Sequence, residues 1–264
     1  MGRHERIERQ RVVIPYTPRP QFEPYHNRTQ RWAWIAAHRR FGKTVGCIND
    51  LIRGALICQK QDPRFAYIAP LYTQAKDIAW TYVKHFTAGI PGVLHHESEL
   101  RADFPNGGRV RLYGAENYDR MRGVYFDGVI LDEYADMDPR VWPEVIRPAL
   151  SDRQGWATFI GTPKGRNGFY ELGFGNPETD WEGALKSDEW FHLVLRASET
   201  GLLAEGELDD ARAVRAGIRM LVRCGDRRCL LRARDGGPRA RQAYPLGALG
   251  TESTGLHGLG PWFG

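Results

Sequence analysis

Apolar residues recur along this chain in two alternating patterns, short runs and longer stretches with helical spacing. The short runs predict the strands of a sheet. A run without polar interruption, such as Val129–Leu131, indicates a central strand covered on both faces. The expected strands are Trp32–Ala37, Phe65–Ala69, Val129–Leu131, Ala157–Ile160 and Phe191–Leu195. The longer stretches, Lys43–Cys58 and Thr73–Phe86, predict helices.

Two further segments complete the expected elements. Leu100–Phe104 and Arg109–Tyr113 alternate apolar and polar residues around Pro105-Asn106-Gly107-Gly108, which predicts a β-hairpin. A helix is expected near Pro139–Leu150, made irregular by its internal prolines. The alternation of strands and helices predicts an α/β fold. In such a fold a mainly parallel sheet is flanked by helices, and the ligand site lies at the carboxyl ends of the strands.

The alternation divides the chain into three parts. Residues 1–31 are expected to form an irregular N-terminal arm, because Pro15, Pro18, Pro20 and Pro24 exclude a continuous helix. Residues 32–213 hold the predicted α/β domain. In residues 214–264 both periodicities fade, and glycine and arginine together make up 19 of the 51 residues. This composition buries little apolar surface and predicts disorder.

The net charge of residues 214–264 differs from that of the rest of the chain. Residues 214–264 have nine arginines, no lysine and three acids, a net charge of +6 against +5 for the whole chain, which leaves −1 for residues 1–213. The tail is therefore either an arginine-rich segment that binds nucleic acid or a stretch translated out of frame. Comparing the three reading frames of its DNA separates the two. The nearly neutral domain gives no charge-based indication of DNA binding.

The remaining composition narrows the class of protein. No stretch approaches 18 consecutive apolar residues, and the N-terminus is polar and arginine-rich, so we expect neither membrane insertion nor secretion. The four cysteines are scattered and form no zinc framework, which suits a reducing, cytoplasmic setting.

The segment between the first strand and the first helix has the features of a phosphate-binding loop. Its sequence is Ala37-His38-Arg39-Arg40-Phe41-Gly42-Lys43-Thr44, with alanine in place of the first glycine of the Walker A pattern. Backbone N–H groups at such a helix start bind phosphate. Lys43 would reach the β- and γ-phosphates, and Thr44 would ligate Mg²⁺. The alternative is a basic loop before an ordinary helix.

A second motif follows the strand at Val129–Leu131, which ends in Asp132 and Glu133. In a Walker B arrangement Asp132 would hold Mg²⁺ and Glu133 would polarise the attacking water. These two tasks are the ones that phosphoryl transfer requires. The alternative is an exposed acidic pair after a strand. Together the two motifs predict a nucleotide hydrolase with ATP and Mg²⁺ as ligands.

With these motifs placed, the chain from about Tyr16 to Ala213 resembles the large terminase subunit of tailed bacteriophages and prophages, the motor that packs viral DNA into a procapsid. The matching segments are Pro18–Phe22, His38–Thr44, Gln74–Lys76 with Trp80, Arg122-Gly123, Leu131–Met137 and Gly161–Asn167. The resemblance implies a P-loop NTPase fold of the helicase or RecA-like type.

The resemblance also implies roles for single residues. Gln21 would read adenine, since an amide both donates and accepts hydrogen bonds. Arg39 would be an arginine finger supplied within the subunit and Arg40 a salt-bridge or phosphate contact, or the two roles are reversed. Thr162 would sense the γ-phosphate and couple hydrolysis to movement. Without the resemblance, Gln21 is a solvated loop residue and Thr162 part of a turn.

The partners that the resemblance implies are double-stranded DNA, the portal protein, the small terminase subunit and further copies of the chain, in the cytoplasm of a bacterial host. Terminases also carry a C-terminal nuclease domain. After Ala213 too few acids follow for a two-metal site, so we expect no DNA cleavage. Two alternatives are another DNA-dependent or helicase-like ATPase and a non-catalytic, truncated prophage remnant.

Overall fold

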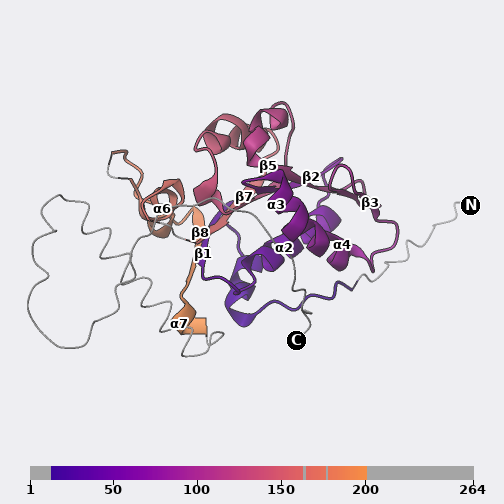
Figure 1. The fold of residues 1–264 in the computed structure, drawn as a ribbon, viewed down its shortest axis with the longest axis horizontal. Coiled ribbons are helices and arrows are strands. Elements are labelled where there is room, and N and C mark those ends of the chain that lie inside the picture. The colour runs from indigo at the N-terminus through magenta and orange to yellow at the C-terminus, as the bar shows by residue number, and fades with distance from the viewer. Residues whose placement is uncertain (1–12, 163–164, 177, 201–264) are drawn as a thin grey trace, which may run out of the picture. The chain divides into compact units, whose positions relative to one another are not determined.

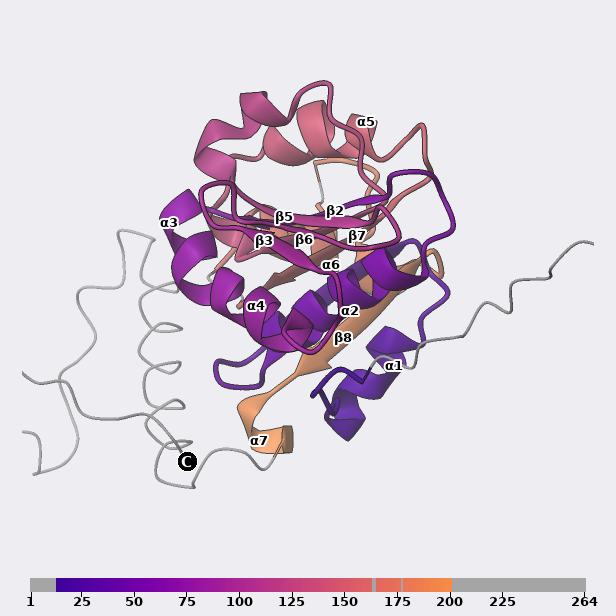
Figure 2. The ribbon, with the colours of Figure 1, turned by 90° about the vertical axis from the view of Figure 1, so that its right-hand side faces the viewer.

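The computed structural model describes residues 13–162, 165–176 and 178–200. An eight-stranded sheet lies between two layers of helices (Figures 1 and 2). The strands are β1 (Trp32–Ala37), β2 (Arg64–Ala69), β3 (Leu94–His96), β4 (Arg101–Asp103), β5 (Arg109–Gly114), β6 (Gly128–Asp132), β7 (Trp156–Gly161) and β8 (Trp190–Leu195). Their order across the sheet is β3-β4-β5-β2-β6-β7-β1-β8.

The sheet is mainly parallel, as predicted. The six strands from β5 to β8 across the sheet pair in parallel. Strands β4 and β5 pair antiparallel and form the expected hairpin, and β3 pairs antiparallel with β4. Each predicted strand and helix is present. The sequence did not predict the short strand β3, the helix Gly168–Phe174 or several short helical segments, namely Pro20–Phe22, Glu23–His26, Ala115–Met121, Tyr134–Asp136, Ala184–Lys186 and Ala197–Thr200.

One helical layer is built around the longest helix, α2 (Lys43–Ile57). It also contains η1 (Pro20–Phe22), α1 (Glu23–His26), α3 (Tyr72–Gln74), η2 (Ala75–Trp80) and α4 (Thr81–Thr87). The opposite layer contains η3 (Ala115–Met121), η4 (Tyr134–Asp136), η5 (Val141–Ile146), α5 (Arg147–Ala149), α6 (Gly168–Phe174) and η6 (Ala184–Lys186); α7 (Ala197–Thr200) follows β8. No helix of the described residues is long and apolar enough to cross a bilayer.

Strand β1 shows why the sheet needs both layers. All six of its side chains are buried. Ala33 and Ile35 join the core beneath α2, while Trp32 and Trp34 join the core on the other face. Alternate side chains of a strand point to opposite faces, so an uninterrupted apolar run requires cover on both sides.

Candidate active site

The loop between β1 and α2 carries the phosphate-binding sequence. Gly42 precedes the helix with φ +91°, a conformation that glycine adopts at little cost. Apart from Gly42 itself and its two chain neighbours, no atom of the described residues lies within 4 Å of the point where a β-carbon of Gly42 would stand. The start of α2 therefore combines open space with backbone N–H groups that can receive an anion.

Ala37 occupies the position of the missing glycine, and the structure explains why alanine fits there. It is the last residue of β1 and pairs with Leu195 of β8, so its backbone is extended. The left-handed conformations of the loop fall instead on Arg40, at φ +66°, and on Gly42. An extended backbone accepts any side chain, so this position does not require glycine.

The two motifs meet at the carboxyl edge of the sheet. The Thr44 hydroxyl donates a hydrogen bond to Oδ2 of Asp132 over 3.0 Å, although 88 residues separate them. Nζ of Lys43 lies 3.2 Å from Oε1 of Glu133. The side chain of Lys43 is 10% exposed, so solvent screens this ion pair less than a surface pair.

Asp132 is held by three donors. The hydroxyl of Tyr67 on β2 and that of Thr44 both donate to Oδ2, and the backbone N–H of Glu133 donates to Oδ1. Burial raises the pKa of the Asp132 carboxyl, while Tyr67 and the charge of Lys43 act against the rise. Burial and the charge of Asp132 raise the pKa of Tyr67 well above its usual range, so the phenol stays protonated and donates.

Glu133 differs from its neighbour in backbone and surroundings. Its φ of +50° and ψ of +45° are left-handed, which is uncommon for a residue with a side chain. Oε2 of Glu133 is buried and receives no hydrogen bond from any described residue. Buried acceptors without a donor are rare, and a catalytic role is one explanation for them.

Thr162 follows β7, the strand between β1 and β6. Its hydroxyl lies 3.5 Å from the carbonyl oxygen of Ala37, at the long limit of a hydrogen bond. The end of β7 therefore lies against the start of the phosphate-binding loop.

The other loop residues divide into buried and exposed ones. His38 is buried; its Nδ1 contacts the carbonyl oxygen of Arg39 at 2.6 Å and its Nε2 the hydroxyl of Thr200 at 2.8 Å. The His38 amide donates to the carbonyl of Leu195, so this residue ties the loop to the β8 side. Phe41 is buried in the core, whereas Arg39 and Arg40 are exposed.

A hollow of about 300 Å³ opens beside Gly42. It lies between the N-terminal arm and the start of α2, and its lining includes Tyr16, Arg19, Phe22, Phe41, Gly42 and Val45. Gln21 lies on η1, between the lining residues Arg19 and Phe22 in the sequence. Its side chain is exposed and does not line the hollow. The guanidinium of Arg19 lies 5.5 Å from the ring centre of Phe41.

The oxygen atoms of Thr44 and Asp132 fit a magnesium ion. Mg²⁺ takes one or two protein oxygens and completes its shell with phosphate oxygens and water. The described residues contain no group of three or more His, Cys, Asp or Glu side chains that could hold a metal by themselves. The residues present therefore suit an ion that arrives with a nucleotide.

Two features of this site escaped prediction from sequence. Tyr67 lies in a strand whose pattern indicates only burial, so nothing marked it as a donor to Asp132. Asp50 is buried on α2 and bound by His26 and Arg28. The one available signal was the Asn49-Asp50 pair, which interrupts the apolar face of that helix.

Known proteins resemble the chain in sequence and in structure. No protein-family model matches it. The large terminase subunit of Thermus phage G20c is 41% identical over 99 residues, which cover 36% of this chain and 20% of that protein. The large terminase ATPase domain of Thermus phage P74-26 has a TM-score of 0.57 and 25% identity, covering 79% of this chain and 89% of that structure. A large terminase from a thermophilic bacteriophage, in complex with ATP-γ-S, has a TM-score of 0.53 at 14% identity, covering 69% of this chain and 44% of that structure.

The chain has the P-loop NTPase fold. This class is defined by the mainly parallel sheet, by the phosphate-binding loop at the start of α2, and by the two carboxylates that lie next to this loop. Within this class its relatives in sequence and in fold are large terminases, which confirms the resemblance found in the motifs. The match spans only a fifth of the length of the Thermus phage G20c subunit.

Proposed function

We propose that this chain is the ATPase part of a viral DNA-packaging motor and hydrolyses ATP. The contacts of Lys43 with Glu133 and of Thr44 with Asp132 carry this proposal, because they bring together the groups that phosphoryl transfer needs. The P74-26 structure is named an ATPase domain and the terminase of the thermophilic bacteriophage binds ATP-γ-S, which supports ATP as the nucleotide.

Each residue then has a task in hydrolysis. Lys43 binds the β- and γ-phosphates in place of its contact with Glu133. The oxygens of Thr44 and Asp132 hold Mg²⁺, which when bound neutralises charge on the phosphates. Glu133 orients the attacking water through a carboxylate whose Oε2 has no other donor among the described residues.

The base and the γ-phosphate have further candidate partners. The hollow beside Gly42 is wide enough for a purine and lined by aromatic rings, which favour stacking. Gln21 stands at its edge and would read adenine by turning inward. Arg39 or Arg40 is the arginine finger, because both side chains are exposed on the phosphate-binding loop. Thr162 is the coupling residue, because it contacts the loop from β7.

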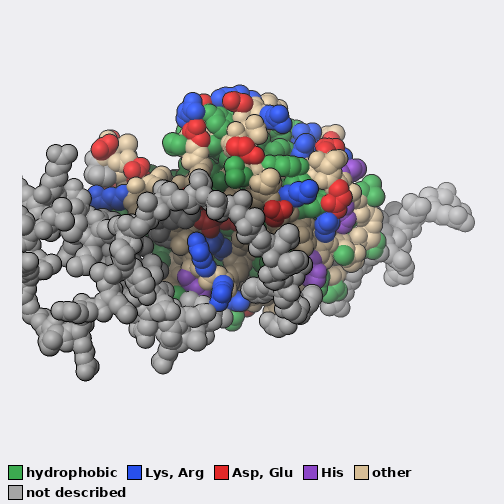
Figure 3. All heavy atoms as spheres, in the orientation of Figure 1, with side chains coloured by type: hydrophobic (Ala, Val, Ile, Leu, Met, Phe, Trp, Pro, Cys, Tyr) green, Lys and Arg blue, Asp and Glu red, His purple; other side chains and the backbone are tan. Residues whose placement is uncertain are grey.

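The partners follow from the packaging role. We propose double-stranded DNA, portal protein, small terminase subunit and further copies of the chain as partners, in the cytoplasm of the bacterial host. Figure 3 shows Lys and Arg side chains interspersed with Asp and Glu on one face of the described residues. Charge therefore does not single out a DNA surface on that face.

Release of phosphate from ATP by the purified chain, with and without double-stranded DNA, tests the proposal. We expect magnesium-dependent hydrolysis, stimulated by DNA and abolished in Lys43→Ala. Lys84→Ala is the matched control, because Lys84 lies on α4 and pairs with Glu97, which follows β3, and not with the site. No hydrolysis by the wild type would favour a non-catalytic remnant, and full activity of Lys43→Ala would indicate a contaminant.

A further inference from the structure

The described part of the N-terminal arm, residues 13–31, contacts one face of α2 at intervals of about one turn. Phe22 packs on Gly46, where a β-carbon would stand 2.2 Å from its ring. One turn further, Asp50 binds His26 and Arg28, and Arg53 then donates to the carbonyl oxygen of His26 over 2.8 Å. These contacts join the arm, which forms one wall of the hollow, to the helix that begins with Lys43.

Asp50 is the centre of this attachment. Its Oδ1 lies 3.3 Å from Nδ1 of His26, and its Oδ2 lies 2.8 Å from a guanidinium nitrogen of Arg28. With the Nδ1 proton directed at the carboxylate, Nε2 of His26 accepts from the hydroxyl of Tyr16, 2.9 Å away. Tyr16 lines the hollow, so the chain of contacts runs from Asp50 to its wall.

Arg28 fixes the other end of the arm. Its guanidinium stacks between the rings of Tyr25 and Trp156, at 4.1 and 4.9 Å from their centres. The side chains of Arg28 and Asp50 are only 7% and 8% exposed. Burying such a pair is a poor way to gain stability, because desolvation offsets much of the attraction. A buried, directional pair does define one position of the arm relative to α2.

We propose that Asp50, itself held by Arg28, is a positioning residue for the nucleotide base and acts through His26 and Tyr16 on the wall of the hollow. The inference rests on the proposed ATPase function. It predicts that loss of the Asp50 charge weakens recognition of the base and leaves the phosphate chemistry at Lys43 intact. A purely structural role would instead lower the active fraction, and with it kcat, without changing KM.

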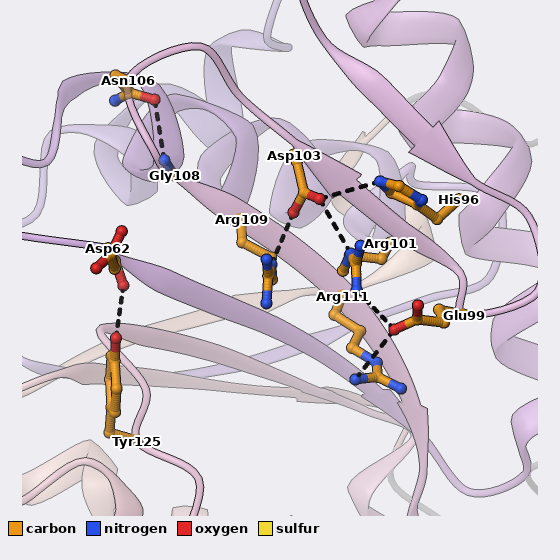
Figure 4. Close-up of polar contacts among 10 residues, drawn as sticks. All are labelled: Asp62, His96, Glu99, Arg101, Asp103, Asn106, Gly108, Arg109, Arg111 and Tyr125. Atoms are coloured by element: carbon orange, nitrogen blue, oxygen red, sulfur yellow. Dashed lines mark hydrogen bonds and ion pairs between the residues drawn. The ribbon is translucent and has the colours of Figure 1, made fainter.

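Asp103 provides a matched control. It binds Arg101, Arg109 and His96 on the β3–β4–β5 segment, so it is again an aspartate that pairs with both arginine and histidine side chains (Figure 4). This cluster is at the far edge of the sheet from β1 and contributes nothing to the hollow beside Gly42. Asp103→Asn therefore shows what the loss of an aspartate with similar partners does when no effect on binding of the nucleotide base is expected.

The experiment compares Asp50→Asn, Arg28→Lys and Asp103→Asn in steady-state ATP hydrolysis by the full chain, with magnesium tripolyphosphate as a competitive inhibitor that lacks a base. We expect KM for ATP to rise about tenfold in Asp50→Asn, which corresponds to about 1.4 kcal/mol of binding free energy. We also expect kcat to stay within about twofold, and Ki for tripolyphosphate to remain unchanged, since neither involves the base. Arg28→Lys should change KM in the same direction, and Asp103→Asn should not change it.

An unchanged KM in folded Asp50→Asn, or parallel increases in KM and in Ki, would overturn the inference while the ATPase proposal stands. Thermal melting of each variant identifies folded protein. Where Asp50→Asn does not fold, KM and Ki of Arg28→Lys test the inference in its place. A wild type that neither binds nor hydrolyses ATP would refute the proposed function itself, and the inference with it.

Discussion

Two adjacent carboxylates at the end of β6 have different surroundings and therefore different chemistry. Asp132 is buried, receives three hydrogen bonds and lies beside Thr44. Glu133 turns away through a left-handed backbone, pairs with Lys43 and keeps one oxygen without a donor from the described residues. A buried carboxylate that hydrogen bonds hold in one orientation, and that keeps a lone pair for a cation, suits metal binding. A carboxylate with an open acceptor suits the orientation of water.

Glu133→Gln tests this division of roles. The amide keeps the shape of the side chain but cannot act as a base, so we expect kcat for ATP hydrolysis to fall by about 10²-fold or more. Binding of Mg·ATP should be retained, because Lys43, Thr44 and Asp132 are unchanged. Single-turnover hydrolysis together with titration of a fluorescent ATP analogue measures both quantities. A variant that hydrolyses ATP at the wild-type rate would exclude Glu133 as the residue that activates water.

Ala37→Gly tests whether the departure from the Walker A pattern matters. Because Ala37 has a strand backbone, glycine brings no new conformation that the loop needs. We expect no gain in activity and a loss of stability of about 0.5–1 kcal/mol, the usual effect of glycine within a strand. Denaturant unfolding and ATP hydrolysis of the same preparation provide the measurements. A large gain in kcat would show that the alanine restrains the loop.

At the scale of elements, helix α2 connects the chemical groups to the N-terminal arm. Its first residues contact Asp132 and Glu133, and its third turn holds His26 and Arg28 through Asp50. Burial alone would raise the pKa of Asp50, but the hydrogen bond from His26 and the charge of Arg28 outweigh it, and the pKa lies below its ordinary value. The ionised form of Asp50 therefore stabilises the folded chain.

The pH dependence of folding tests this attachment. A carboxyl whose pKa is lower in the folded than in the unfolded chain stabilises the fold above the unfolded pKa, and this contribution is lost as pH falls through the folded pKa. We expect Asp50→Asn to be less stable than the wild type near neutral pH. The difference should shrink in acid, below the ordinary pKa of 3.8. Urea unfolding at several pH values measures it, and a difference that is independent of pH would contradict the charged role of Asp50.

Some helices and strands of this fold were predictable from the sequence alone, and others were not. Strands such as Trp32–Ala37 and helices such as Lys43–Ile57 were predictable because their apolar spacing is long and regular. Helix α6 was not, because its stability comes from tertiary contacts. Trp34 donates to the carbonyl oxygen of Phe169 and packs so tightly on Gly173 that a β-carbon there would stand 2.4 Å from its ring. Its one local signal was Asn167, whose side chain caps the helix at Tyr170.

At the scale of the whole molecule, the strand order determines which residues meet. The sequence predicts parallel strands whose carboxyl ends share an edge, and so predicts that Lys43 and Asp132 are neighbours. It does not reveal that β7 lies between β1 and β6, which brings Thr162 against Ala37. Strand order depends on contacts between distant segments, and local patterns do not record these. The predicted tail, residues 214–264, lies outside the described residues.

Calorimetric titration of the full chain with Mg·ATP, for the wild type and for Lys43→Ala, tests directly whether the site binds nucleotide. We expect saturable binding at one site per chain that requires magnesium and weakens at least about tenfold in the variant, as for loss of one charged phosphate contact. Equal binding by both proteins, or no binding by the wild type, would contradict the claim that Lys43, Thr44, Asp132 and Glu133 form a site for Mg·ATP.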